Sequence, residues 1–257
     1  MLHVGFRVAD PAERRASRVA QDRRMATGTA VPVADGAVEL VRVRLDAELE
    51  ATDELAQCLS DAERLRAGRF VFERDRRRFI VGRARLRRLL ALRLGTRADL
   101  VELDYGRRGK PRLAGGFAES DLRFNVSHCG DVALYAFSSG REIGVDVEAV
   151  RELRDADGVA ARFFSCRENE AYLALDPRDR PLGFFHCWTR KEAFVKALGD
   201  GLHFPLDAFD VSLAPGEPAR ILRVADVAGS ACGWTLHDVD LGLEPRFAAA
   251  VVVRDCT

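Results

Sequence analysis

The segment Ile143–Glu148 constrains the fold most strongly, because apolar residues alternate along it with glycine and acidic residues. A period of two is that of a β-strand, in which successive side chains point to opposite faces. The pattern sends the three aliphatic side chains to one face, and Gly144, Asp146 and Glu148 to the other. Neighbouring carboxylates repel each other unless a cation or solvent compensates. The segment therefore predicts a half-buried strand whose acidic face either binds a hard divalent ion or is solvated.

Apolar periodicity and turn residues predict a mixture of strands and helices in the rest of the chain. Strands are expected at 38–45, 100–103, 122–126, 132–137 and 143–147, with a hairpin turn at Ser139-Gly140 before the last, and strand-like runs follow at 209–213, 219–224, 233–239 and 247–253. Helices are expected at 53–72, 75–94, 165–175 and 182–198. The helix at 75–94 has an apolar stripe, with arginines on its other face. The two long helices both end at glycine before an extended segment, which suggests a duplicated unit.

The helix expected at 182–198 carries a second set of polar residues. Trp188, Glu192 and Lys196 are spaced by four residues and share one side of the helix. An exposed Glu–Lys pair at this spacing is commonly only a surface salt bridge. Together with Asp146 and Glu148, however, Glu192 would complete an open magnesium site, since magnesium is held by few carboxylates plus phosphates and water.

Two shorter motifs offer groups that can contact an anion. In Phe124-Asn125-Val126-Ser127-His128, a strand ends with two polar side chains, and the alternative for His128 is a structural role. In Gly109-Lys110-Pro111, a lysine lies in a rigid turn, and the alternative is an ordinary exposed loop. Lysine is rare here, because the forty basic residues include only Lys110, Lys191 and Lys196. A compact ammonium contacts a phosphate oxygen as a point charge, which a planar guanidinium does not.

The charge of the chain argues against a general nucleic-acid binder, because forty acidic residues balance the basic ones. The distribution is uneven, since the stretch from Arg64 to Arg97 has thirteen arginines and only two acids. One region thus favours anions, and an arginine-rich module that binds RNA or DNA phosphates without catalysis is the competing interpretation.

Targeting and cysteine patterns narrow the class further. No run of eighteen apolar residues and no secretory signal is present, so we expect no membrane association and a cytoplasmic location. The six cysteines form no C-x-x-C pair, which favours reduced thiols. A zinc enzyme using His128-Cys129 and His186-Cys187 is a third interpretation, although the ligand spacing of zinc sites is lacking.

The order of four motifs resembles that of the Sfp-type 4′-phosphopantetheinyl transferases over about residues 38–253. These motifs are Gly-Lys-Pro at 109–111, Phe-Asn-Val-Ser-His at 124–128, Gly-Val-Asp-Val-Glu at 144–148 and Trp-Thr-Arg-Lys-Glu-Ala-Phe-Val-Lys at 188–196. The resemblance implies an α+β fold of two similar α/β subdomains related by a pseudo-twofold axis, with coenzyme A between them. Residues 1–36 have no sustained apolar period, so we expect them to form a mobile N-terminal extension. An N-terminal subdomain is expected at 37–120 and a C-terminal subdomain with the metal site at 121–257.

The resemblance also implies residue roles. Asp146, Glu148 and Glu192 would hold magnesium, or manganese as a substitute, against the pyrophosphate, and Lys196 would contact a phosphate and neutralise the leaving group. Contacts with the phosphates of coenzyme A would come from six further residues: Lys110, Ser127, His128, Arg66, Arg69 and Arg78. Cys129, which follows the histidine, is interpreted as a harmless small residue.

The implied reaction moves 4′-phosphopantetheine from coenzyme A to a serine of an acyl, aryl or peptidyl carrier protein, of the kind that serves secondary metabolism, and releases adenosine 3′,5′-bisphosphate. Positioning and charge neutralisation should dominate such a reaction. Glu192 is the candidate base for the serine proton, with a metal-bound water as the alternative. Clustered arginines are expected to steer an acidic carrier, and the duplication within one chain suggests a monomer.

Overall fold

The computed structural model describes residues 29–31, 33, 38–46, 52–106, 109–199, 204–224, 233–244 and 246–255. They form two compact units. The first is built from the described residues between Leu45 and Glu102, and the second from the earlier described strands together with the described residues from Leu103 onward. Along the described parts of the chain, no helix has the length and apolarity needed to cross a membrane.

The first unit is helical. It contains α2 (Thr52–Ala56), α3 (Asp61–Ala67), α4 (Glu73–Leu94) and the short 3-10 helix η1 (Ala98–Leu100). The single helix expected at 53–72 is wrong, because Ser60 starts a new helix: its hydroxyl accepts from the Glu63 backbone N–H, and the Glu63 carboxylate accepts from the Ser60 N–H. The strand expected at 100–103 is also displaced, since η1 occupies its start and β3 (Leu103–Tyr105) follows.

Several arginines of α4 are internal, although the apolar stripe had suggested a solvent-facing basic side. Arg85, Arg87 and Arg88 are buried. Arg87 donates to the Glu63 carboxylate at 2.6 Å and to the Val101 carbonyl at 2.7 Å. Arg87 therefore bonds within the first unit, and the burial of all three side chains keeps them from the phosphates of a partner, which weakens the nucleic-acid interpretation.

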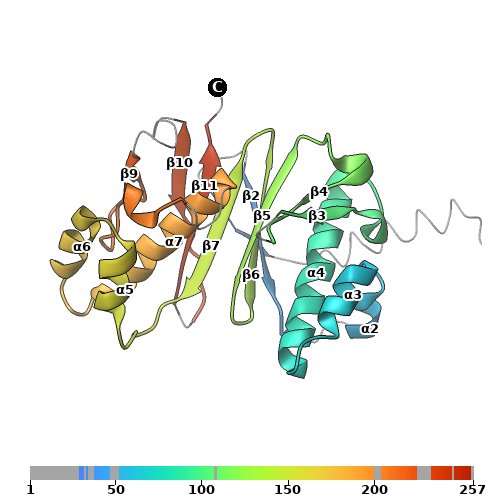
Figure 1. Cartoon of the computed structure of the whole chain (residues 1–257), viewed down its shortest axis with the longest axis horizontal. Helices are drawn as coiled ribbons and strands as arrows, with labels where there is room; N and C mark the ends of the chain where they lie inside the picture. Colours follow the sequence, from blue (N-terminus) through green and yellow to red (C-terminus); the bar gives the residue numbers. More distant parts are fainter. Residues whose placement is uncertain are drawn as a thin grey trace, which may run out of the picture. The chain divides into compact units, whose positions relative to one another are not determined.

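The second unit contains the β-sheets (Figure 1). Its strands are β1 (Thr29–Val31), β2 (Glu39–Arg44), β3, β4 (Pro111–Leu113), β5 (Leu122–Cys129), β6 (Val132–Ser139), β7 (Ile143–Ala149), β8 (Phe209–Val211), β9 (Ile221–Val224), β10 (Trp234–Asp238) and β11 (Phe247–Arg254). Two larger sheets have the antiparallel orders β1-β2-β6-β5 and β10-β11-β7, and β3-β4 and β8-β9 form two small ones. Strand β1 lies within the extension expected at 1–36. The sequence pattern did not indicate it, because a three-residue edge strand pairs through its backbone and needs no apolar period.

The hairpin expected between β6 and β7 is wrong. Strand β6 pairs with β2 and β5, whereas β7 pairs with β11, with Asp146 opposite Ala250. Gly140 does reverse the chain with φ of 67°, but its N–H donates to the Asp121 carbonyl, which extends the β5–β6 pairing and forms no bond to β7. Turn chemistry thus located the reversal correctly but not the partner of the next strand.

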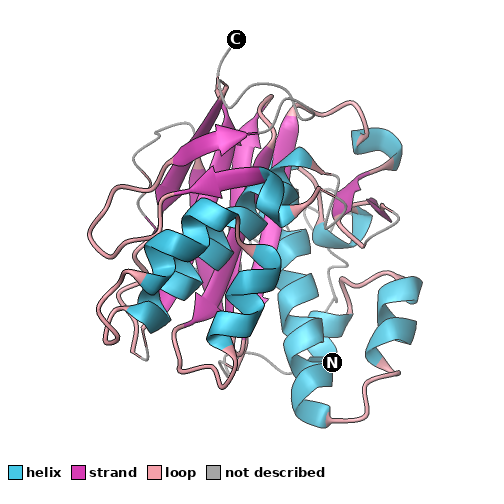
Figure 2. Ribbon diagram, turned by 60° about the vertical axis from the view of Figure 1, so that its left-hand side comes forward, coloured by secondary structure: helices cyan, strands magenta, loops and turns pink. Residues whose placement is uncertain are grey.

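Helices cover one face of the β10-β11-β7 sheet. They are α5 (Ala156–Phe163), which the sequence pattern did not predict, α6 (Cys166–Leu173) and α7 (Arg180–Leu198), with the short helices η2 (Gly115–Phe117) and η4 (Leu206–Ala208) elsewhere in the unit. Helix α7 packs directly on β7 and β11 (Figures 1 and 2). The other face of the sheet, including Ile143, Val145 and Val147, packs on Leu40 and Leu134 of the β1-β2-β6-β5 sheet. The two faces of β7 are therefore divided as the alternation predicted.

Candidate active site

Three of the predicted site residues meet between β5, β7 and α7. The ammonium Nζ of Lys196 lies 2.5 Å from Asp146 Oδ1 and 3.1 Å from Ser127 Oγ. Ser127 Oγ in turn donates to Asp146 Oδ1 at 2.8 Å. Asp146 and Ser127 are buried, whereas the Lys196 side chain keeps 29% of its exposure. One end of this cluster is therefore fixed in the protein and the other reaches solvent.

Gly144 allows α7 to bring Lys196 and Glu192 over β7. A Cβ atom at Gly144 would lie 2.1 Å from the Ala193 carbonyl oxygen and 2.4 Å from the Ala197 backbone nitrogen. Both obstacles are backbone atoms, so a side chain there would push the helix off the strand. Ala193 and Ala197 are themselves fully buried small residues. The glycine in the Gly-Val-Asp-Val-Glu motif is thus explained by close approach.

Lys110 joins this cluster through the backbone of α7. Its Nζ donates to the Lys196 carbonyl oxygen at 2.6 Å, at the C-terminal end of the helix. A cation at this position also interacts favourably with the helix dipole. Burial lowers the pKa of Lys110, and the neighbouring Lys196 charge lowers it further while Glu142 raises it. Lys110 therefore fixes the helix end that carries Lys196.

Glu148 lies one step along β7 from Asp146 and has different neighbours. Its Oε2 is 3.4 Å from Cys129 Sγ and 3.7 Å from the Arg151 guanidinium. The Cys129 sulfur also accepts the Ala149 N–H at 3.3 Å. Burial is the main cause that raises the pKa of the Cys129 thiol. The protonated thiol donates a hydrogen bond to the Glu148 carboxylate.

Glu192 is half-buried on the α7 side. Burial raises its pKa first, and the negative charges of Asp146 and Glu148 raise it further, whereas the Lys196 ammonium opposes them. The three carboxylates therefore repel one another, which is the electrostatic signature of a site that a cation would relieve.

Asp146, Glu148 and Glu192 have the chemistry to bind a hard divalent cation, since all three are carboxylates. Among the buried side-chain atoms of the described residues, Asp146 Oδ2 has no hydrogen-bond partner. The carboxylates do not converge as they stand, because within the described ranges no three Asp, Glu, His or Cys side chains gather closely enough to hold a metal. Lys196, not a third carboxylate, is the group placed on Asp146.

Side chains replace backbone pairing between β5 and β7, a feature that the sequence reasoning missed. Asn125 Oδ1 accepts the Val145 N–H at 3.1 Å, and the Ser127 and Cys129 bonds to β7 follow at alternate positions. We refer to Asn125, Ser127 and Cys129 with their β7 partners as the β5–β7 seam. Polar residues at every second position of β5 were the available signal, because one face of a strand repeats with a period of two.

The remaining predicted residues are distributed over both units. His128 is exposed on β5 next to Ser127. Arg66, Arg69 and Arg78 belong to the first unit, where Arg66 and Arg69 are exposed and the guanidinium carbon of Arg66 lies 5.2 Å from the Phe79 ring centroid. Arg78 is partly buried, and its Nε has no hydrogen-bond partner among the described residues.

Lys191 and the cysteines have structural surroundings. Lys191 is completely buried and lies 2.7 Å from the Glu168 carboxylate. Cys58, Cys129, Cys166 and Cys187 form no disulfide with one another, while Cys232 and Cys256 lie outside the described residues. Nothing in the described part of the chain assembles a zinc site around the two His-Cys pairs.

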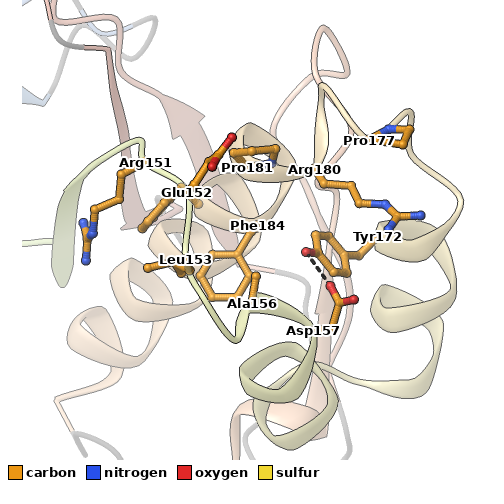
Figure 3. A pocket seen from close by; sticks show the side chains of 11 residues that line it. Arg151, Glu152, Leu153, Ala156, Asp157, Tyr172, Pro177, Arg180, Pro181 and Phe184 are labelled. Carbon is orange, nitrogen blue, oxygen red and sulfur yellow. Dashed lines mark hydrogen bonds between the residues drawn. The ribbon is translucent and has the colours of Figure 1, made fainter.

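An apolar pocket of about 170 Å³ adjoins Glu148. Its wall contains Glu148 and Arg151, together with Leu153, Val159, Phe184, Phe185 and Trp188. A second pocket of about 240 Å³ shares Arg151, Leu153 and both phenylalanines, and extends to Tyr172, which donates to Asp157 at 3.0 Å (Figure 3). The acidic cluster therefore has an apolar surface beside it.

Comparison with known proteins agrees with the motif order. A family model described as the 4′-phosphopantetheinyl transferase superfamily matches residues 142–252, and one described as 4′-phosphopantetheinyl transferase, N-terminal, matches residues 47–139. The chain is 40% identical over 216 residues to the 4′-phosphopantetheinyl transferase HetI of Nostoc sp., covering 84% of this chain and 87% of the relative. It is 29% identical over 201 residues to the 4′-phosphopantetheinyl transferase Sfp of Bacillus subtilis, covering 78% and 86%.

These matches define the class of the protein as an enzyme that transfers a 4′-phosphopantetheinyl group. The chain belongs to the 4′-phosphopantetheinyl transferase superfamily and is of the Sfp type within it. The α+β class expected from the sequence is confirmed. The division at residue 120 and the pseudo-twofold relation of the halves stay predictions.

Proposed function

We propose that this protein transfers 4′-phosphopantetheine from coenzyme A to a serine of an acyl, aryl or peptidyl carrier protein, with magnesium, and releases adenosine 3′,5′-bisphosphate. The observation that carries the proposal is the Ser127–Asp146–Lys196 cluster, in which one oxygen of the buried carboxylate has no partner in the part of the chain that the structure describes. The identity of the transferred group, 4′-phosphopantetheine, is inferred from the family to which the chain belongs.

Lys196 and Ser127 have the position and chemistry to bind phosphate. Lys196 reaches solvent with an ammonium that its neighbours already orient. A phosphate that approached this ammonium would meet a positive charge held in place, so little reorganisation would be needed as negative charge develops on the leaving group. In the proposal, Lys110 and His128 contribute further contacts to phosphates, and Arg66, Arg69 and Arg78 of the first unit bind the nucleotide end.

The proposed reaction forms one P–O bond and breaks another. The serine oxygen of the carrier attacks the β-phosphorus of coenzyme A, and the bond to the bridging oxygen of adenosine 3′,5′-bisphosphate breaks. The serine proton passes to the Glu192 carboxylate, whose pKa is raised above the ordinary value for glutamate by burial and by two neighbouring carboxylates. A raised pKa makes a carboxylate a better base.

Asp146, Glu148 and Glu192 are the residues that would hold the magnesium ion. When bound, the ion would act as a Lewis acid on the pyrophosphate and offset the mutual repulsion of the three carboxylates. The chain contributes the hard oxygen donors, including the unpartnered Asp146 Oδ2. The apolar pocket beside Glu148 is proposed to receive the pantetheine arm, since Glu148 forms part of its wall.

The test is the intact mass of an apo carrier protein after incubation with this protein, coenzyme A and magnesium. We expect the carrier to gain one phosphopantetheine, and we expect EDTA, Asp146→Ala or Glu192→Ala to prevent the gain. Glu217→Ala, at an exposed position, is the control and should behave as wild type. Absence of a gain with several unrelated carriers would contradict the proposed function.

A further inference from the structure

Each strand residue of the β5–β7 seam that faces an acidic residue of β7 donates a hydrogen bond to it. Ser127 Oγ donates to Asp146 and Cys129 Sγ donates to Glu148, at the same offset of nineteen positions in the chain. The two bonds are repeats of one arrangement, because residues 127 and 129 of β5 and residues 146 and 148 of β7 are alternate positions on their strands.

Cys129 is tied to β7 from two directions. Its sulfur donates to Glu148 Oε2 at 3.4 Å and accepts the Ala149 backbone N–H at 3.3 Å. The thiol is thus held against the strand, and its donor is directed at one carboxylate oxygen. A small apolar residue would preserve the packing but provide neither bond.

Glu148 also has a competing partner. The Arg151 guanidinium lies 3.7 Å from the same oxygen Oε2 and is itself half exposed, with 54% of its side chain accessible. Without the thiol, this flexible cation would be the only one of the two donors left to orient Glu148. The carboxylate would then be drawn toward solvent and away from Asp146.

We propose that Cys129 is a positioning residue for the metal site, which holds the Glu148 carboxylate in the orientation that binds a divalent cation. The inference rests on the proposed function, because it assigns Glu148 as a ligand. It changes the interpretation of Cys129 from a harmless small residue to a residue that supports the reaction without touching substrate. The partners that orient metal ligands typically influence metal affinity about 10- to 100-fold, although a thiol donor belongs at the weak end.

Binding of Mn²⁺ followed by electron paramagnetic resonance tests this directly, since the free ion gives the signal and no turnover is needed. The titration is carried out on the full chain with saturating coenzyme A and no carrier, after subtraction of a protein-free blank. We expect Cys129→Ala to raise the dissociation constant for Mn²⁺ about 10-fold. Cys129→Ser, which keeps a donor and an acceptor, should recover most of the affinity.

Two controls separate positioning from general damage. Cys166→Ala removes an exposed thiol on α6 and should leave Mn²⁺ binding unchanged. In turnover assays, Cys129→Ala should need more magnesium for half-maximal rate, while its KM for the carrier stays at the wild-type value. Excess magnesium should restore kcat, which a merely structural defect would not allow.

The outcomes distinguish the inference from the function on which it rests. If wild type and Cys129→Ala bind Mn²⁺ equally, or if Cys129→Ala and Cys129→Ser are weakened equally, the positioning role is wrong while the metal site stands. If wild type binds no more Mn²⁺ than Asp146→Ala does, the proposed metal site fails and the inference fails with it.

Discussion

Two lysines of helix α7 each pair with a carboxylate from another element, Lys191 with Glu168 of α6 and Lys196 with Asp146 of β7, and the surroundings of the two pairs differ. Lys191 and Glu168 are both almost fully buried, at 1% and 2% side-chain exposure. Lys191 also donates to the carbonyls of Leu206 and Phe209, both at 2.6 Å. Each group in this pair has its partners, and none is left for a ligand.

The pair Lys196–Asp146 is incomplete by comparison. Asp146 keeps one buried oxygen that has no hydrogen-bond partner among the described residues, and the Lys196 side chain reaches solvent. A saturated buried pair fixes the fold, whereas an unsaturated one keeps bonding capacity for something that arrives. The rarity of lysine in the chain singled out both residues, but only the structure shows that their surroundings differ.

The largest expected effect on stability follows from Glu168→Ala, which breaks the buried Lys191–Glu168 pair. Glu168 accepts from the Ser165 and Val211 backbone N–H groups as well as from Lys191. Its loss would leave a buried ammonium without its counter-charge, so we expect the free energy of unfolding to fall by about 3–5 kcal/mol. Glu170→Ala, at an exposed position of helix α6, which also carries Glu168, should change the free energy of unfolding little. Equal denaturation midpoints for the two variants would contradict the account.

The stability of the fold in acid should depend on His186, which also lies on α7. Burial is the main cause that lowers the pKa of His186 to about 4, and the neighbouring Arg190 charge adds to it. Because the folded pKa lies below the unfolded one, the stabilising contribution is present above about pH 6.5 and is lost as the pH falls toward 4.

The corresponding experiment compares urea unfolding of wild type and His186→Gln between pH 7 and pH 4. We expect wild type to lose on the order of 3 kcal/mol more than the variant over this range. Parallel losses in both proteins would show that His186 does not carry the acid sensitivity.

Gly144→Ala should displace helix α7, which carries Glu192 and Lys196, from strand β7. The added methyl meets the Ala193 oxygen and the Ala197 nitrogen, so we expect a loss of about 1–3 kcal/mol in stability together with reduced transfer activity. Gly183→Ala is the matched control, because its nearest obstacle is the flexible end of Leu175. If both variants were equally active and stable, close approach would not explain Gly144.

The smallest expected effect belongs to Lys110→Met without coenzyme A. Loss of the bond to the Lys196 carbonyl and of a cation at the helix C-terminus should lower the stability by about 0.3–1 kcal/mol. A role restricted to phosphate would instead give equal or higher stability in the absence of ligand, since a buried charge would be removed. Thermal unfolding of the ligand-free protein decides between the two signs.

The local parts of this fold could be predicted from the sequence, and the non-local ones could not. The alternation in β7 identified its faces, and the four-residue spacing of Glu192 and Lys196 placed both on one helix face. The pairing of β7 with β11 depends on residues a hundred positions apart, about which the Ser139-Gly140 turn carries no information. The expected helix at 53–72 failed because its apolar residues concealed the Ser60–Glu63 capping box.

The candidate site shows the same division. Motif order brought Asp146, Ser127 and Lys196 together correctly. The positioning role proposed for Cys129 could not be found in this way, because the sequence does not show which groups its thiol contacts. Lys191 had invited a special explanation for the same compositional reason as Lys196, and its explanation is a buried ion pair.

We propose that Lys196 and Asp146 take part directly in phosphopantetheine transfer, whereas the Lys191–Glu168 pair only supports the fold. The most direct test is the single-turnover rate of phosphopantetheine transfer to an apo carrier, per folded molecule, for Lys196→Ala and for the double variant Lys191→Met/Glu168→Gln, which removes both buried charges. We predict a loss of about 10²- to 10³-fold for Lys196→Ala and a near wild-type rate for the double variant. Wild-type transfer by Lys196→Ala, or an equal loss in the double variant, would contradict the claim.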